Sequence, residues 1–267
     1  MNRGMNNMYY GCKKEINDKR DYKMYIATTK ATHYPDRYEI TTTNVKDQGI
    51  VNSCVAHTLA SFLEETYKTQ DKQFSVGFIY GYRPAGYNIE EGMYPRDAMK
   101  TLLKVGDCLK SDFDYNREMP QIKLLVDGNI DKLKPLAEKY RIKSYARIYS
   151  KQDILKCLYN DITVPISIPI YNDLAIDKLT KMVKQPEGEC NGYHMILLVG
   201  YNEHGYIFQN SWGKNWGDNG RAILPYDYPI DTAWAISTES NDVYTYTTLW
   251  QKIYTFILKI LNKIKNK

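Results

Sequence analysis

Four side chains of this sequence have the chemical types that acyl transfer to a thiol requires. Cys54 supplies a thiol, His194 an imidazole, and Asn210 and Gln48 supply amides. A thiol with a pKa of about 8.5 is mostly protonated at neutral pH, and only the thiolate attacks a carbonyl well. A helix N-terminus and a nearby imidazolium both lower the thiol pKa. These residues therefore predict a cysteine nucleophile paired with a histidine.

The positions of these residues suggest how each would act. Cys54 opens an amphipathic stretch, and His194 opens an apolar one. Asn210 follows sixteen positions later, where its amide is expected to accept the Nδ1 hydrogen of the imidazole, with Trp212 covering that bond from water. Gln48 precedes the cysteine by six residues and is expected to stabilise an oxyanion together with a backbone N–H.

The periodicity of apolar residues predicts the elements that hold these side chains. Helical spacing is found at 54–68, 95–105 and from Ser150 onward, where Ser150 and Asp153 resemble a capping box. Strands are predicted at 164–170, 193–201 and 205–212, with a hairpin turn between the last two. Helices in the first half and strands in the second predict an α+β protein of two lobes.

Composition and charge narrow the class of protein. The 267 residues are 43% hydrophobic and 25% charged, which is typical of a folded domain. The net charge of +5 equals the five lysines of residues 249–267, which contain no acidic residue, so the rest of the chain is formally neutral. We therefore expect no nucleic-acid partner.

The five cysteines form no CxxC pair and have no spacing suited to zinc. We expect no metal or other cofactor and no disulfide framework. No secretory signal is visible at the N-terminus. A reducing intracellular compartment is expected, or packaging in a virion if the source is a large DNA virus.

Three segments resemble the papain and cathepsin family of cysteine peptidases. Residues 48–54 (QGIVNSC) are similar to the segment around the catalytic cysteine, 193–201 (YHMILLVGY) to the histidine strand, and 209–220 (QNSWGKNWGDNG) to the asparagine block. The resemblance covers about residues 35–238. It implies a papain-like fold, with a helical lobe at about 48–125, a β-rich lobe at about 126–240, and an active-site cleft between them.

The resemblance also implies the substrate-binding residues, which are Gly92, Met93, Tyr193, Met195 and Trp212. Met93 stands where the family has a glycine whose backbone binds substrate as an antiparallel strand. Met195 follows the catalytic histidine and lines the S2 pocket, which it is expected to narrow. Val51 stands where the family has one cysteine of a disulfide, and the segment that contains Met93 lacks the other cysteine. That disulfide is therefore absent here. No His-His pair appears between residues 78 and 106, which favours endopeptidase action.

The two ends of the chain leave alternatives open. Residues 1–34 occupy the place of the family's inhibitory propeptide and are expected to be either a short self-blocking segment or a disordered tail. Residues 241–267 form a basic tail in which apolar side chains recur at helical spacing from 249 to 264. That tail would bind weakly to a membrane surface, or pack on the body or a partner. The oligomeric state is not predicted.

The chemistry predicts a cysteine-type endopeptidase that hydrolyses polypeptide substrates through an acyl-enzyme. Two alternatives remain: a catalytically silent homologue that binds peptides or a partner, and an acyl transferase that uses the same thiol with an amine acceptor.

Overall fold

The computed structural model describes residues 10–16, 18, 21, 23–25, 34–42, 44–68, 72–83, 91–114, 122–238 and 244–246. Side chains are described in these ranges except at 23–25, 122–125 and 244–246. The predicted tail helix at 249–264 lies outside the described residues.

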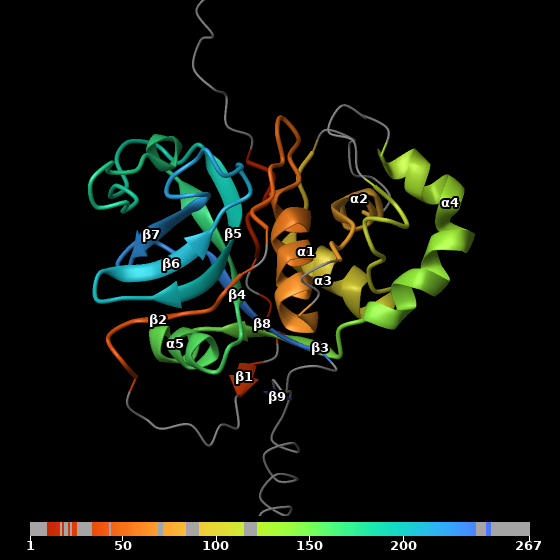
Figure 1. Ribbon diagram of the computed structural model, residues 1–267, viewed down its shortest axis with the longest axis horizontal. Coiled ribbons are helices and arrows are strands. Elements are labelled where there is room, and N and C mark those ends of the chain that lie inside the picture. The colour runs from red at the N-terminus through yellow and green to blue at the C-terminus, as the bar shows by residue number, and fades with distance from the viewer. Residues whose placement is uncertain are drawn as a thin grey trace, which may run out of the picture.

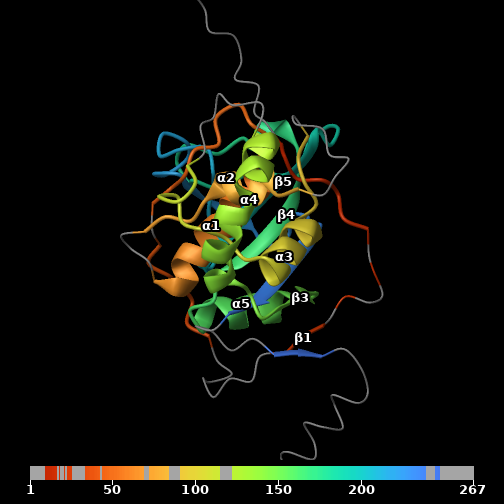
Figure 2. The same ribbon diagram turned by 90° about the vertical axis from the view of Figure 1, so that its right-hand side faces the viewer.

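Four helices form one lobe: α1 (Cys54–Tyr67), α2 (Val76–Gly81), α3 (Pro95–Lys104) and α4 (Ile122–Ala137). They lie together on one side of the molecule, and α4 lies on its outer face (Figures 1 and 2). Ser75 caps α2 by accepting a hydrogen bond from the Phe78 N–H, and Pro95 begins α3 at its first position. Lys68 ends α1 in the left-handed region at φ 51°.

The helical lobe extends further along the chain than the sequence indicated. The expected boundary at about 125 falls inside α4, whose residues Val126, Leu133 and Ala137 share a buried cluster with Phe78 of α2. The lobe therefore continues to the end of α4. Sequence analysis missed this helix because Gly128 and Pro135 interrupt its pattern.

The other lobe is built on a sheet of nine strands in the order β7-β6-β5-β4-β8-β3-β1-β9, with β2 paired to β5. The strands are β1 (Lys23–Tyr25), β2 (Tyr38–Glu39), β3 (Ser144–Ile148), β4 (Val164–Ile170), β5 (Gly192–Tyr201), β6 (Gly205–Gln209), β7 (Arg221–Pro225), β8 (Thr232–Ser237) and β9 (Tyr244–Tyr246). Helix α5 (Lys151–Tyr159) and the short 3₁₀ turns Glu138–Tyr140 and Asn172–Leu174 complete the described elements.

Several local predictions are confirmed. The helix expected at 54–68 is α1, the one at 95–105 is α3, and Ser150 caps α5 by accepting from the Asp153 N–H. The strand predicted at 164–170 matches β4, and the hairpin between β5 and β6 turns at Asn202, whose Oδ1 accepts from the N–H of Gly205. The strand predicted at 205–212 ends earlier, at Gln209.

Residues 10–16, which we call the N-terminal arm, run between the two lobes. Figure 1 shows this red segment lying between β5 and α1. Cys12 forms bridges to Tyr193 of β5 and to Met93, which precedes α3. Farther along the chain, β1 adds to the sheet beside β3 and β9.

Candidate active site

Cys54 occupies the first position of α1 and is fully buried. Its helix packs directly on β5, where the Thr58 hydroxyl donates to the Met195 carbonyl at 2.9 Å. The backbone N–H of Met195, the residue that follows His194, acts to lower the pKa of the Cys54 thiol. The fold therefore brings the cysteine at the start of the helix to the histidine strand, as the sequence predicted.

His194 is held by Asn210 through the opposite ring nitrogen from the one expected. Nε2, not Nδ1, lies 2.8 Å from Asn210 Oδ1, so the expected Nδ1 bond is wrong. Nδ1 is buried and has no hydrogen-bond partner among the described residues. The observed bond to Nε2 leaves Nδ1 without a role in holding the ring. The indole of Trp212 stacks on the imidazole with ring centroids 4.5 Å apart, which covers the ring from water as expected.

Gln48 is fully buried and its amide is oriented by two contacts. Oε1 accepts the Ser211 hydroxyl at 2.7 Å, and Nε2 donates to the Val51 carbonyl at 2.9 Å. An amide nitrogen carries two hydrogens, so the bond to Val51 uses one of them. The amide is thus fixed to the loop before Cys54 and to the residue after Asn210.

The acid–base state of the pair differs from the sequence expectation. Burial raises the pKa of Cys54 to about 11, although the N–H groups of Met195 and Gly11 act in the other direction. Burial also lowers the pKa of His194 to about 4, against the opposing effect of its bond to Asn210. The expectation of a lowered thiol pKa at the helix start is wrong for this state, because exclusion of water outweighs the helix dipole. In this buried state both shifts favour the uncharged forms of the two side chains.

The N-terminal arm packs closely beside the thiol. A Cβ atom on Gly11 would lie 2.0 Å from the Asn52 carbonyl oxygen, and one on Gly92 would lie 2.0 Å from the Gly11 carbonyl oxygen. Three backbones therefore meet beside the thiol at distances that only glycine permits. Tyr10 lies against the other side of the site, with its ring 6.5 Å from that of His194.

The arm runs in the direction opposite to that implied for a substrate. Met93 N–H donates to the Gly11 carbonyl at 2.9 Å and Lys13 N–H donates to the Met93 carbonyl at 3.1 Å, which is a parallel bridge. The family resemblance implies an antiparallel substrate at this position. As a result, Gly11 turns its N–H toward Cys54 while its carbonyl is bound to Met93. The Gly11 carbonyl therefore does not point to the Cys54 thiol.

Arg96 fastens the arm at the start of α3. Its Nη1 lies 2.6 Å from Glu15 Oε2, and its backbone N–H donates to Glu15 Oε1 at 2.7 Å. Nε and Nη2 form a fork on the carboxylate of Asp21, at 3.1 and 2.6 Å. The Glu15 side chain is fully buried in this contact. No local pattern predicts this anchor, since Arg96 lies some eighty positions from its two acidic partners.

The residues predicted to bind substrate lie beside the arm. Met93 and Tyr193 form backbone bridges to Cys12 on its two sides, and Gly92 packs against the Gly11 carbonyl. Met195 is buried beside them. Sequence analysis missed Ser167 of β4, which pairs with Met195 and receives the Cys12 thiol at 3.3 Å. A serine within an apolar strand was the only signal that pointed to it.

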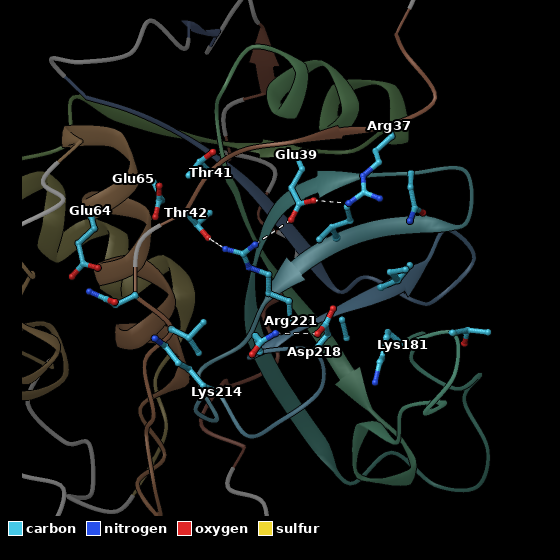
Figure 3. Close-up of a pocket in the computed structure, with 18 of the residues that line it drawn as sticks. Arg37, Glu39, Thr41, Thr42, Glu64, Glu65, Lys181, Lys214, Asp218 and Arg221 are labelled. Carbon is cyan, nitrogen blue, oxygen red and sulfur yellow. Dashed lines mark hydrogen bonds and ion pairs between the residues drawn. The ribbon is translucent and has the colours of Figure 1, made fainter.

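A separate cavity of about 990 Å³ lies beside the C-terminal end of α1 and strands β6 and β7, and none of the predicted site residues lines it. Figure 3 shows Glu39 lying between Arg37 and Arg221 at this cavity. Glu39 accepts from Arg37 at 3.0 Å and from Arg221 at 3.1 Å. Its chemistry therefore does not belong to the cysteine site.

Neither a metal-binding cluster nor a membrane-spanning helix is present among the described residues. No cluster of three or more His, Cys, Asp or Glu side chains there could hold a metal ion. No helix in the same part of the chain is both long and apolar enough to cross a membrane.

Comparison with known proteins gives a consistent result. A sequence model described as "Papain family cysteine protease" matches residues 31–227. An uncharacterized peptidase C1-like protein of Acanthamoeba polyphaga mimivirus is 29% identical over 207 residues, covering 69% of this chain and 65% of the relative. Falcipain-3 of Plasmodium falciparum is 27% identical, covering 78% of this chain and 44% of the relative. The chain thus spans less than two thirds of these relatives.

Among solved structures, xylellain, a cysteine protease from Xylella fastidiosa, superposes with a TM-score of 0.75 at 26% identity, covering 86% of this chain and 96% of that one. A procathepsin B from Trypanosoma congolense has a TM-score of 0.70 at 15% identity and covers 87% of each chain, a likeness of fold. The papain-like α+β fold of two lobes is therefore confirmed.

Proposed function

Because this chain belongs to the papain family of cysteine proteases, we propose that it is an endopeptidase that cleaves polypeptides with Cys54 as nucleophile. The observation that carries the proposal is the orientation of His194. Asn210 Oδ1 lies 2.8 Å from His194 Nε2, and His194 Nδ1 has no hydrogen-bond partner in the described structure. The next residue, Met195, acts on the Cys54 thiol through its backbone N–H.

The proposed reaction begins when the arm leaves and water returns to the site. His194 then takes the thiol proton, and the thiolate attacks the scissile carbonyl. The oxyanion is stabilised by the Gln48 amide and the Cys54 backbone N–H. Imidazolium protonates the departing amine, and water activated by the same ring releases the acyl group and restores the thiol.

We further propose that residues 1–34 act as a self-blocking segment through the N-terminal arm. The reversed direction of the arm supports this role, because it presents the Gly11 N–H to the sulfur in place of a carbonyl. The anchor of Glu15 and Asp21 on Arg96 supports it as well, since buried ion pairs are costly to break. The resting protein would then be latent.

The same observations give less support to two other functions. A silent binding protein would not require the His194–Asn210 bond that orients a proton-transfer group. Acyl transfer to an amine would follow from the same thiol, and mass spectrometry of the products separates it from hydrolysis. Polypeptide substrates are proposed on the family alone. The viral relative agrees with a viral source; the compartment and any membrane contact of 249–267 stay predictions from the sequence.

The decisive experiment combines labelling with turnover. In a Gly11→Val background, which is designed to displace the arm, an epoxide thiol inhibitor is expected to modify Cys54 stoichiometrically, as mapped by peptide mass spectrometry, and to abolish hydrolysis of a fluorogenic peptide. Cys54→Ala should lose both. Cys157→Ala is the matched control, because that buried thiol in α5 lies outside the site. Hydrolysis that persists in Cys54→Ala would refute the proposal.

A further inference from the structure

Ser167 lies at a position where a single hydroxyl can read the side chain of a ligand. It is fully buried in the middle of β4, whose other residues are isoleucine, valine and proline. Its cross-strand neighbour is Met195, which the family resemblance places in the S2 pocket. S2 receives P2, the second substrate residue on the N-terminal side of the scissile bond.

The arm shows what this pocket accepts. Cys12 is held between the backbones of Met93 and Tyr193, and its side chain enters the space beside Met195. The Cys12 thiol lies 3.3 Å from Ser167 Oγ. Among the described residues, the Cys12 thiol is the side-chain hydrogen-bond partner of the Ser167 hydroxyl. Although the arm runs backward, its Cys12 side chain lies where the family resemblance places a P2 side chain.

The pocket around Cys12 is small and closed. Met93 and Met195 are 1% and 0% exposed, and Cys12 itself is 6% exposed. Trp234 belongs to the same buried cluster. A close-packed wall of this kind resists a larger side chain, because added methylene groups force neighbours from their preferred conformations. A leucine at P2 would meet these walls.

A buried hydroxyl without a partner is unfavourable, and a site built to hydrogen-bond rejects a ligand that lacks the matching group. Once the arm leaves, Ser167 loses the Cys12 thiol, and an alanine or leucine at P2 would not replace it. We propose that Ser167 is a specificity-determining residue that selects a small hydrogen-bonding P2 side chain, such as serine, threonine or cysteine. This inference rests on the proposed peptidase function for the identity of the ligand.

The first test uses the arm of the full-length protein as the ligand. Cys12→Ser, Cys12→Ala and Cys12→Leu are made with and without Ser167→Ala, and iodoacetamide alkylation of Cys54 is followed by peptide mass spectrometry at pH 7. Faster alkylation reports weaker docking of the arm. Alkylation should be roughly fivefold to tenfold faster in Cys12→Ala than in Cys12→Ser, the value of one hydrogen bond, and faster still in Cys12→Leu.

In the Ser167→Ala background the difference between Cys12→Ser and Cys12→Ala should vanish. Thr163→Ala is the matched control, since it removes a buried hydroxyl just before the same strand and should preserve the difference. Equal protection of Cys54 by serine and leucine at position 12, or a difference that survives Ser167→Ala, would overturn the assignment.

The second test uses peptidyl acyloxymethyl ketones with glycine at P1 and serine, alanine, leucine or lysine at P2. Opening of the arm affects every reagent equally, so the ratios of their labelling rates at Cys54 report the pocket alone. Serine should exceed alanine roughly fivefold to tenfold, and Ser167→Ala should remove that ratio. Preference for leucine, or for lysine through nearby Asp231, would sink the inference. Labelling without any peptide turnover would instead refute the proposed function and leave the pocket assignment standing.

Discussion

A Cβ atom at Gly11 would lie 2.0 Å from the carbonyl oxygen of Asn52, two residues before the candidate nucleophile. Such a contact is far inside the sum of atomic radii, and the atom that would be struck is backbone at the entrance to α1. The arm can therefore close over Cys54 only because position 11 has no side chain.

Gly11→Val is predicted to displace the arm. Alkylation of Cys54 by iodoacetamide and hydrolysis of a fluorogenic peptide should both rise at least about tenfold, since a severe backbone clash costs more than about 1.4 kcal/mol. Gly128→Ala is the control, because its Cβ would meet nothing within 4 Å. If both glycine variants react like the wild type, the arm does not block the site.

The stability of the docked arm should depend on pH and be greatest within a limited pH range. Burial lowers the pKa of His194 from 6.5 to about 4, so the docked state binds a proton less readily than the open state. Docking is therefore complete above 6.5 on this account and weakens as pH falls toward 4. Burial raises the pKa of Cys54 from 9.0 to about 11, so docking is complete below 9 and weakens above it.

Hydrogen exchange of residues 10–16, corrected for intrinsic rates, measures this window. Between pH 7 and 4.5 opening should increase roughly tenfold to a hundredfold. His194→Gln should flatten the acid limb, whereas His204→Gln, at an exposed turn, should preserve it. An acid limb that is unchanged in His194→Gln would contradict the assignment to this ring.

Asn210→Ala is predicted to lower kcat/KM for peptide hydrolysis by about 10-fold to 100-fold, the usual range for a buried hydrogen bond to a group that becomes charged. The bond at 2.8 Å holds the imidazole with Nδ1 available to the thiol. Asn219→Ala, in an exposed turn, is the control. An effect confined to KM would indicate that Asn210 aids binding and does not orient the ring.

Asp107→Asn is predicted to stabilise the fold at neutral pH. The carboxyl group is fully buried, and burial raises its pKa well above the ordinary value, against the smaller opposing effects of the Cys108 backbone N–H and of Lys46. A raised pKa means that its contribution is most favourable below about pH 4 and is lost as pH increases.

Urea unfolding should therefore show a gain of about 1–3 kcal/mol for Asp107→Asn at pH 7 and a smaller gain at pH 4. Asp36→Asn, on an exposed segment, should change neither value by more than about 0.5 kcal/mol. A loss of stability at pH 7 would mean that the carboxylate has a favourable partner.

Sequence alone determined the parts of this protein that depend on local pattern. Cys54 at a helix start, His194 on an apolar strand and Asn210 beyond the next hairpin strand follow from periodicity and spacing. The strand at 164–170 and the cap at Ser150 follow in the same way, because residues near in sequence decide them.

Only the tertiary structure decided the rest. The choice of Nε2 over Nδ1 depends on how the His194 ring lies against Trp212. The reversed arm depends on hydrogen bonds between Gly11, Cys12 or Lys13 and residues at least eighty positions away. The raised pKa of Cys54 depends on burial of the thiol, which is a property of the assembled chain. Spacing places a nucleophile and its partners in order, whereas long-range packing sets their orientation, their protonation and what covers them.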